Sequence, residues 1–232
     1  MMDVIRSFEI PKTNEVKKNE KRGFWEIKSK ENMSISDART FFDKLFREMR
    51  DKEKDYYTSY EDRIKYTPRE DSELGIWEGE RGESRFILSE ETAAGAAAKQ
   101  KLSEYGMDGV EYKFAEPDFS DCCEAEVKID NMTARRENYE DKNGEYQQGN
   151  FFQADAKCAE QWNNTKRDGM DDWTAADVRE WRRDNQCSWH ECCDTSTMQL
   201  VPRDIHSVFR HSGGVAECAA RDNSNIGGVF DE

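Results

Sequence analysis

Histidine and long apolar runs are scarce in this chain of 232 residues, and its 35 lysines and arginines are outnumbered by 50 aspartates and glutamates. No apolar run reaches the roughly 20 residues that a membrane-spanning helix needs, so we expect no membrane span. Met1–Lys18 has no apolar core, which argues against a secretory signal peptide. The formal net charge is −15. An acidic surface keeps a protein soluble, but it offers little to a phosphate-rich partner, which normally draws on Lys and Arg.

The seven cysteines form no CxxC pair. Cys122–Cys123 and Cys192–Cys193 are adjacent pairs, and the odd total leaves at least one thiol unpaired within a single chain. Reduced thiols in a cytosolic protein are the simplest interpretation. A zinc cluster of Cys187, His190 and the pair Cys192–Cys193 has suitable ligand types. Two adjacent cysteines, however, chelate one ion poorly.

All three histidines, His190, His206 and His211, lie close together near the C-terminus. Imidazole is the side chain best suited to proton transfer near neutral pH, and it is the commonest metal ligand. A single histidine is more often a structural residue with its hydrogen bonds satisfied. Three in one short stretch, and none elsewhere, indicate a functional site.

The pattern around these histidines predicts a strand, a polar loop, a second strand and a helix. Pro202 suits the first turn of that helix, where its missing N–H costs nothing. Gly213–Gly214 would stop it. His190 then ends the first strand and His206 lies on the helix. The predicted segments are Cys187–His190, Glu191–Thr197, Met198–Val201 and a helix with Ile205, His206, Val208 and Phe209.

His211 follows His206 by five residues, which turns it roughly 140° away on an ideal helix. The two rings can reach one ion only if the helix ends by about Arg210, and Gly213–Gly214 favours such an ending. Trp189 faces the opposite side of its strand from its neighbours. We expect this indole to be core rather than part of the site.

Upstream, apolar spacing predicts further strands and helices. Phe24–Ile27 has a strand pattern, and Ser34–Arg50 has a helical one. Asp51–Lys65 reads as a solvated helix with a half-buried face. Further along, we expect a hairpin of Leu74–Trp77 and Ser84–Leu88, a helix over Thr92–Tyr105, strands at Val110–Lys113, Pro117–Phe119 and Ala125–Ile129, and a helix over Phe151–Trp162.

The strand-loop-strand-helix pattern resembles the ββα-metal core of the HNH and endonuclease VII nuclease superfamily. It is most similar to toxin nucleases with Trp-His-His, Met-x-Leu-Val-Pro, His and His-[Thr/Ser]-Gly-Gly motifs. The corresponding residues are Trp189–Glu191, Met198–Pro202, His206 and His211–Gly214. One position departs from the pattern, because Glu191 stands where the family has a second histidine.

The resemblance implies an α+β fold with a C-terminal ββα-metal (His-Me finger) nuclease core and preceding strands and helices. We expect residues 74–232 to form the HNH-like nuclease toxin domain, with its core at about 186–216. Residues 1–73 are a helical, charged region, either a delivery or pretoxin segment or an extension of the same domain.

The resemblance also implies a metal-dependent endonuclease with one divalent ion: Mg²⁺, Mn²⁺, Ni²⁺ or Zn²⁺. His206 and His211 are candidate metal ligands, with Asp194 as a further one. His190 is expected to be the general base and Glu191 a metal ligand beside it. The reverse division remains open, with His190 on the metal and Glu191 taking the proton, as adjacent residues divide these roles in nuclease colicins.

Thr174 and Asp177 predict the capped start of another helix. Arg179, Arg182 and Arg183 gather on or near one side of it. Directly before the site, these three guanidinium groups could grip phosphate. As an alternative, they are ordinary cations at a helix C-terminus, where they complement the dipole.

The function implied is an interbacterial toxin that cleaves DNA in preference to RNA and is blocked by a cognate immunity protein. Such a toxin is secreted or delivered as part of a larger protein and acts in the cytoplasm of the target cell. The alternative is a non-catalytic adaptor or inhibitor that keeps the fold and binds a basic partner through its acidic surface. Metal-dependent nicking of plasmid DNA separates the two.

Overall fold

The computed structural model describes residues 56–227, with side chains described to residue 224. The chain divides into two units, Met1–Met49 and Arg50–Glu232, and the described residues all belong to the second. The strand expected at Phe24–Ile27 and the helix expected at Ser34–Arg50 lie outside the described residues. Of the described helices, none is both long and apolar enough to cross a membrane.

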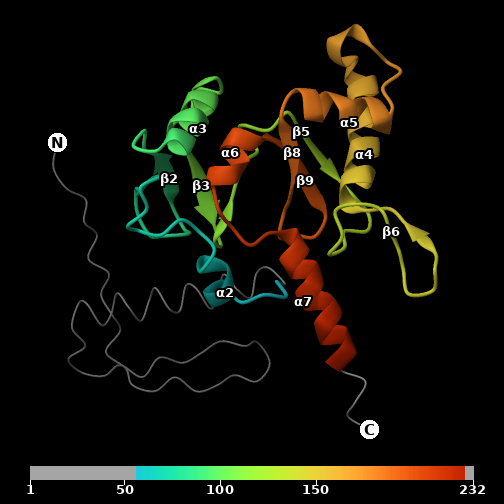
Figure 1. Ribbon diagram of the computed structural model, residues 1–232, viewed down its shortest axis with the longest axis horizontal. Coiled ribbons are helices and arrows are strands. Elements are labelled where there is room, and N and C mark those ends of the chain that lie inside the picture. The colour runs from blue at the N-terminus through green and yellow to red at the C-terminus, as the bar shows by residue number, and fades with distance from the viewer. Residues whose placement is uncertain (1–55, 228–232) are drawn as a thin grey trace, which may run out of the picture. The chain divides into compact units, whose positions relative to one another are not determined.

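The described part is a mixed α+β structure, as expected (Figure 1). Its helices and strands alternate irregularly along the chain. In order they are α2 (Tyr60–Ile64), β1 (Gly75–Trp77), β2 (Arg85–Leu88), α3 (Ala93–Ser103), β3 (Gly109–Lys113), β4 (Glu116–Pro117), β5 (Ala125–Lys128), β6 (Tyr139–Glu140), β7 (Tyr146–Gln147), α4 (Asn150–Thr165), a 3₁₀ turn (Arg167–Gly169), α5 (Ala175–Asp184), β8 (Cys187–Glu191), β9 (Thr197–Pro202), α6 (Arg203–Val208) and α7 (Gly214–Gly227).

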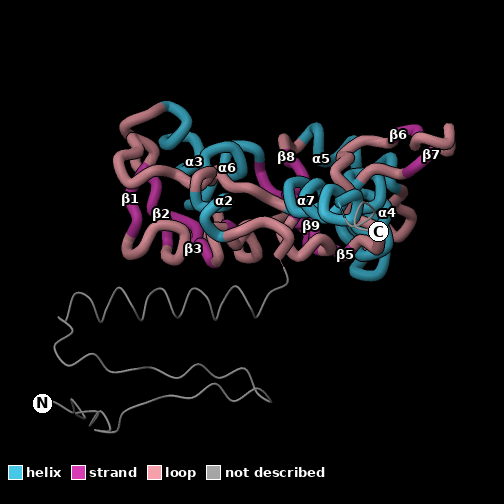
Figure 2. The backbone as a smooth tube through the Cα atoms, turned by 90° about the horizontal axis from the view of Figure 1, so that it is seen from below, coloured by secondary structure: helices cyan, strands magenta, loops and turns pink. Residues whose placement is uncertain are grey.

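The strands form two antiparallel sheets and one hairpin. One sheet has the order β1-β2-β3-β4, the other has the order β5-β9-β8, and β6 pairs only with β7. Figure 2 shows the β6–β7 hairpin at the far end of the described structure from the four-stranded sheet. Two buried clusters follow from this division. One lies between β2, β3, α3 and α6, and the other between the three-stranded sheet, α4 and α5.

Helix α6 links the two clusters, because it contacts α3 on one side and β8 and β9 on the other (Figure 1). Its apolar residues Ile205, Val208 and Phe209 are buried in the first cluster. Trp189 is buried in the second, on the α4 side of β8. The pleat alternates side chains between faces, so His190 points to the α6 side. The prediction that Trp189 is core is confirmed.

Local signals explain how the helices beside the site begin. The Thr174 side chain accepts a hydrogen bond from the Asp177 amide, and the Asp177 carboxylate accepts one from the Thr174 amide, so the capping box is complete. The Thr92 hydroxyl caps α3 in the same way through Gly95. A Cβ on Gly95 would lie 2.4 Å from the Ser89 carbonyl oxygen, so only glycine allows this close approach.

Three predicted boundaries need correction. Helix α6 ends at Val208, well before Gly213–Gly214, and Gly214 instead begins α7, which the sequence pattern did not indicate. The strand expected at Pro117–Phe119 is Glu116–Pro117. In the helix expected over Asp51–Lys65, the described helical residues are Tyr60–Ile64, with Tyr60 and Arg63 on its buried face and Glu61 and Asp62 exposed.

The two glycines serve close packing rather than a helix stop. A Cβ on Gly213 would lie 2.7 Å from the Glu191 carbonyl oxygen, and one on Gly214 would lie 2.5 Å from that of Cys192. Side chains at these positions would therefore push the segment after α6 away from the end of β8. The glycines let this segment run against the strand and carry His211 toward His190.

Candidate metal centre and active site

The structure brings the three histidines together. His190 comes from β8, His206 from α6, and His211 from the segment after that helix. The ring centroids of His190 and His211 are 4.6 Å apart, those of His206 and His211 5.3 Å, and those of His190 and His206 5.5 Å. One ring nitrogen of each lies within 4.8 Å of one from each of the others. The three rings, called the histidine triad below, therefore face a common point.

The early end of α6 explains how His211 joins the triad. After Val208 the chain leaves helical geometry at Phe209, whose φ and ψ are −85° and 76°. The Phe209 carbonyl oxygen then lies 2.8 Å from His211 Nδ1, which orients that ring. Its other nitrogen, Nε2, is left to accept. The condition that the helix ends before about Arg210 is met.

The Phe119 ring packs against all three rings of the triad. Its ring centroid lies 5.0 Å from that of His190, 5.7 Å from that of His206 and 6.3 Å from that of His211. The side chain is fully buried. This apolar ring keeps water from one side of the three imidazoles and restricts their orientation. The sequence offered Phe119 only as a strand residue.

Electrostatics keep the triad neutral at neutral pH. Burial, followed by the nearby His211 and His206, lowers the pKa of His190 well below its ordinary value. Burial lowers the pKa of His206 to about 3. Burial also lowers the pKa of His211, although the contact with the Phe209 carbonyl partly opposes it. Neutral imidazoles have lone pairs to offer a metal.

The same rings contain buried polar atoms without a hydrogen-bond partner. These are Nδ1 and Nε2 of His190 and Nε2 of His206. Leaving a buried polar atom unpaired costs about 1–3 kcal/mol, so native structures rarely keep one without a reason. A divalent cation bound by the three imidazoles would take up one lone pair from each ring, including one of the two unpartnered His190 nitrogens. The residues present therefore fit a metal of the kind that imidazole prefers, such as Zn²⁺ or Ni²⁺.

Glu191, the last residue of β8, turns its side chain away from that of His190, as the pleat requires. Its carboxylate points to the α4 side, where it accepts hydrogen bonds from Arg136 Nε at 3.1 Å and from Asn150 Nδ2 at 3.2 Å. The side chain is 4% exposed. Burial raises its pKa, while the Arg136 charge and the two hydrogen bonds act in the opposite direction. Its oxygens are not grouped with the triad nitrogens.

Arg136 is a site residue that the sequence did not reveal. Its side chain is 59% exposed, so the guanidinium can meet a ligand from solvent. After burial, its charge is a further cause of the lowered pKa of His190, of His206 and of His211, so the guanidinium acts electrostatically on all three rings as well as on Glu191. No local spacing marked Arg136, since its partners lie far along the chain.

Asp194 lies in the turn between β8 and β9 and is exposed. One carboxylate oxygen accepts hydrogen bonds from the amides of Ser196 at 2.9 Å and Thr197 at 2.7 Å, and the other accepts one from the Thr197 hydroxyl at 2.6 Å. The structure does not group it with the triad nitrogens. Its visible role is to hold the turn.

The three arginines of α5 are not brought to the triad. Arg182 is buried in an ion pair with Asp155, at 2.8 and 3.2 Å, and Asp155 also accepts a hydrogen bond from Trp189 Nε1 at 2.8 Å. Arg179 Nε lies 3.8 Å from the same carboxylate, and Arg183 is exposed. This network is on the Trp189 face of β8. It fastens α4, α5 and β8 together rather than presenting three free cations.

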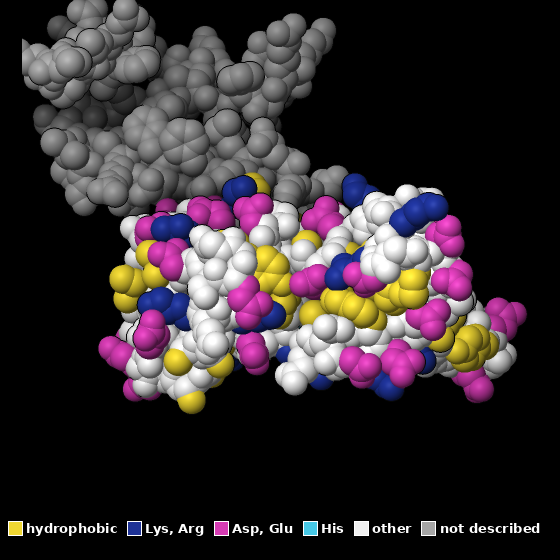
Figure 3. Space-filling view, turned by 90° about the horizontal axis from the view of Figure 1, so that it is seen from above, with side chains coloured by type: hydrophobic (Ala, Val, Ile, Leu, Met, Phe, Trp, Pro, Cys, Tyr) yellow, Lys and Arg dark blue, Asp and Glu magenta, His cyan; other side chains and the backbone are white. Residues whose placement is uncertain are grey.

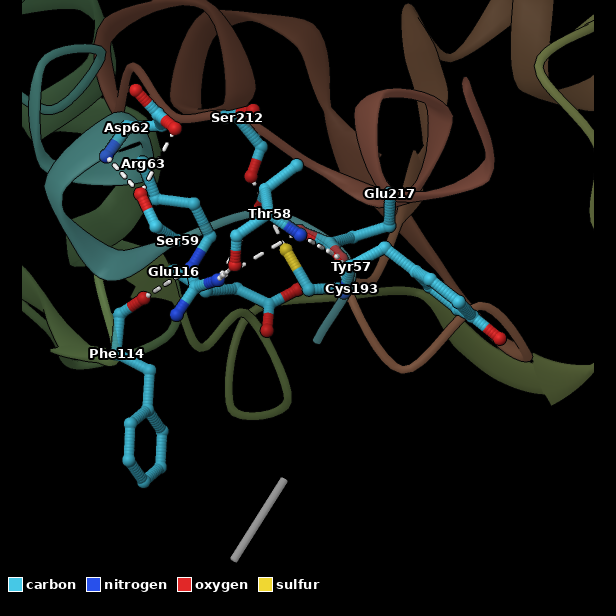
Figure 4. Close-up of polar contacts among 10 residues, drawn as sticks. All are labelled: Tyr57, Thr58, Ser59, Asp62, Arg63, Phe114, Glu116, Cys193, Ser212 and Glu217. Atoms are coloured by element: carbon cyan, nitrogen blue, oxygen red, sulfur yellow. Dashed lines mark hydrogen bonds and ion pairs between the residues drawn. The ribbon is translucent and has the colours of Figure 1, made fainter. Parts of the chain in front are cut away.

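A second buried network surrounds the pair Arg63 and Glu217 (Figure 4). Arg63 and Glu217, with side chains each 1% exposed, are 3.8 Å apart and link α2 to α7. Glu217 accepts hydrogen bonds from the Tyr57 amide and from the amide and hydroxyl of Thr58. Arg63 Nε donates to the Phe114 carbonyl at 3.0 Å. Residues far apart in the chain thus enclose the β3–β4 turn.

Glu116 follows the β3–β4 turn, and its carboxylate lies near the His190 ring of the triad. Its Oε1 accepts a hydrogen bond from the Cys193 amide at 2.5 Å and lies 3.8 Å from His190 Nε2.

The surface of the molecule carries side chains of mixed character. Figure 3 shows acidic, basic and apolar side chains interspersed on one face of the molecule.

Comparison with known proteins agrees with this geometry. Residues 109–213 match the family described as the DNase/tRNase domain of colicin-like bacteriocin. The matched range begins at β3 and includes all three histidines of the triad. No curated protein and no solved structure matches the chain. The resemblance to the toxin nucleases is thereby confirmed for residues 109–213, which are similar to the DNase/tRNase domain of colicin-like bacteriocins.

Proposed function

We propose that this domain is a metal-dependent, HNH-type endonuclease that hydrolyses phosphodiester bonds of DNA and serves as an interbacterial toxin. The observation that supports this most directly is the triad: three clustered imidazoles, one buried and two partly buried, with unpaired ring nitrogens on His190 and His206 and the buried ring of Phe119 against them. The strand-turn-strand-helix frame that holds them is the one expected of the ββα-metal core.

His190, His206 and His211 would hold one divalent cation. Bound there, the cation supplies charge neutralisation for the phosphate and lowers the pKa of a coordinated water. This choice assigns His190 to the metal, the alternative that the sequence left open. The cation would engage one of the two His190 ring nitrogens that lack a hydrogen-bond partner.

Glu191 is then the proton acceptor of the pair. Its burial raises the pKa of the carboxyl group toward the range in which general bases work well. Arg136 holds this carboxylate and projects into solvent beside the triad, where its guanidinium can contact the phosphate. Arg179 and Arg183 would at most contact more distant phosphates, and Arg182 keeps its structural partner.

The biological setting follows from the matched family. The domain would act as the toxic part of a larger secreted or delivered protein, in the cytoplasm of a target cell, and a cognate immunity protein would block the site in the producer. The acidic net charge of −15 predicts that this immunity protein presents a basic surface rather than an acidic one.

The test is nicking of plasmid DNA, with tRNA beside it because the family includes both activities. The full chain, freed of metal by a chelator, is assayed with Mg²⁺, Mn²⁺, Ni²⁺ and Zn²⁺ in turn. We expect nicking to return with at least one ion and to fall at least about 100-fold in His206→Ala, since even a supporting contact to a metal ligand is worth about 10–100-fold.

Arg183→Ala, an exposed cation outside the triad, is the matched control and should keep its activity. Intact plasmid and intact tRNA with every ion would overturn the proposal. That result would favour the non-catalytic acidic adaptor, whose binding to a basic partner could then be sought.

A further inference from the structure

A hollow of about 250 Å³ is lined by Glu116 and Cys192, both of which have a ligand atom within 4.8 Å of a His190 ring nitrogen. It lies between the β3–β4 turn and the β8–β9 turn. Its lining carries an excess of negative charge, because it contains four acidic side chains and a single lysine, Lys113. Phosphate would be repelled from such a cavity and a cation attracted. The acidic residues are Glu116, Asp118, Glu126 and Asp194.

Two of its lining residues can act together with His190 as ligands. A Glu116 oxygen, a His190 ring nitrogen and Cys192 Sγ all lie within 4.8 Å of one another. The three come from β4, β8 and the turn that follows β8. His190 is 1% exposed, and neither of its ring nitrogens has a hydrogen-bond partner. One of them, Nε2, is 3.8 Å from Glu116 Oε1.

A second buried acceptor lies on the same side of the sheet. Gln199 is directly opposite His190 in the β8–β9 register, so their side chains share a face. Gln199 lines the hollow, is 5% exposed, and donates through Nε2 to Glu126 at 2.9 Å. Its carbonyl oxygen, Oε1, has no hydrogen-bond partner. An unpaired acceptor in an acidic hollow again indicates a cation.

The neighbouring cysteines do not compete for this role. Cys193 turns its thiol to the Ser212 carbonyl at 3.2 Å and its amide to Glu116. Cys187 is packed in the core on the Trp189 side of the sheet. The zinc cluster considered from the sequence is therefore replaced by one that keeps His190 and Cys192 and adds Glu116.

We propose that Glu116, His190 and Cys192 form a second cation site, for a zinc-class ion, that shares His190 with the triad. One sulfur, one nitrogen and one oxygen ligand with an open fourth position suit Zn²⁺ and do not suit Mg²⁺, which avoids thiolates. On binding, Cys192 Sγ forms the bond to the ion as a thiolate and its proton passes to solvent.

Sharing His190 makes the two sites competitive. A neutral imidazole has one lone pair to give, because its other nitrogen carries the proton. His190 therefore serves one cation at a time. Excess zinc in the second site would withdraw His190 from the triad and inhibit the enzyme. This inhibitory consequence rests on the proposed function, whereas the ligand set does not.

The first experiment uses Co²⁺ as a spectroscopic probe in the full chain carrying His206→Ala, which removes one ligand of the triad only. We expect a sulfur-to-cobalt charge-transfer band. Adding Cys192→Ser should abolish it. Adding Cys123→Ser, a partly buried cysteine whose thiol donates to the Ser120 carbonyl, should leave it. Absence of the band in the parent, or its survival in Cys192→Ser, would overturn the second site.

The second experiment titrates zinc into nicking reactions supported by Mn²⁺. Cys192→Ser should keep the basal rate and require about 10-fold more zinc for half inhibition, in line with the loss of one contact to a metal. Equal zinc sensitivity of the two proteins would contradict the competition. If no nicking occurs at all, the proposed function fails while the cobalt band still decides the second site.

Discussion

Glu191 follows His190 directly, yet the pleat of β8 sends the two side chains to opposite faces of the sheet. His190 meets the other histidines, and Glu191 meets Arg136 and Asn150. The sequence predicted both residues as catalytic but left their roles open. Strand alternation was readable, but which face would hold the metal depended on α6, and no local pattern shows where a helix packs.

Substitutions of Glu191 and His190 distinguish a general base from a metal ligand. Glu191→Gln can still hydrogen bond with Asn150 and Arg136 but cannot take a proton. We expect its nicking rate to fall at least about 100-fold, since general base catalysis contributes about 10²–10⁴-fold. Its cation affinity, measured by calorimetry, should not change. His190→Ala should lose both. Weaker cation binding in Glu191→Gln together with normal binding in His190→Ala would reverse the assignment.

Asp155 is the reason that Arg182 is not free to contact phosphate in the way that the sequence had suggested. The sequence placed three cations near one another but could not show that a buried carboxylate on α4 would pair with Arg182. Asp155→Asn leaves that guanidinium buried and uncompensated. We expect a loss of about 3–5 kcal/mol in the free energy of unfolding, measured by urea denaturation.

The control for Asp155 lies on the same helix. Glu160 is exposed and is paired only with the exposed Lys157, at 3.7 Å. Glu160→Gln should change the free energy of unfolding by less than about 1 kcal/mol. Equal effects of the two substitutions would show that the buried pair has no special stabilising role.

At the scale of elements, the ββα core was predictable because its signals are local. β-branched and apolar residues, a polar turn and Pro202 mark its boundaries within a residue or two. The short length of α6 and the presence of α7 were not predictable. Gly213–Gly214 suggested a helix stop, but the backbone contacts that need these glycines come from β8.

Gly213 therefore offers a test of how the segment after α6 positions His211. In Gly213→Ala the new Cβ would meet the Glu191 carbonyl oxygen at 2.7 Å and His211 at 3.3 Å. We expect the segment to shift and the affinity of the triad for a cation to fall roughly 10–100-fold, as when a supporting contact of a metal ligand is lost. Gly79→Ala, in an exposed turn, should bind normally. Unchanged affinity in Gly213→Ala would show that His211 needs no such close approach.

At the scale of the whole described structure, the matched range 109–213 is held by contacts with residues on both sides of it. Residues 56–73 precede it and α7 follows it, and the pair Arg63–Glu217 joins the two across the β3–β4 turn that leads to Glu116. Sequence patterns do not show such pairing between residues at opposite ends of a domain. Residues 56–73 thus contact both α7 and the turn that precedes Glu116.

Arg63 and Glu217 should act as one unit in the stability of the molecule. Each is fully buried, so removing either side chain leaves the other's charge without compensation, at a cost of about 3–5 kcal/mol. In a double-mutant cycle in the full chain, Arg63→Ala with Glu217→Ala should lose less than the sum of the single losses, with a coupling of about 0.5–3 kcal/mol in urea unfolding. Arg69→Ala, whose guanidinium is 76% exposed, should have almost no effect. Strict additivity of the two single losses would mean that α2 and α7 are held independently, and that the N-terminal segment does not brace the site through this pair.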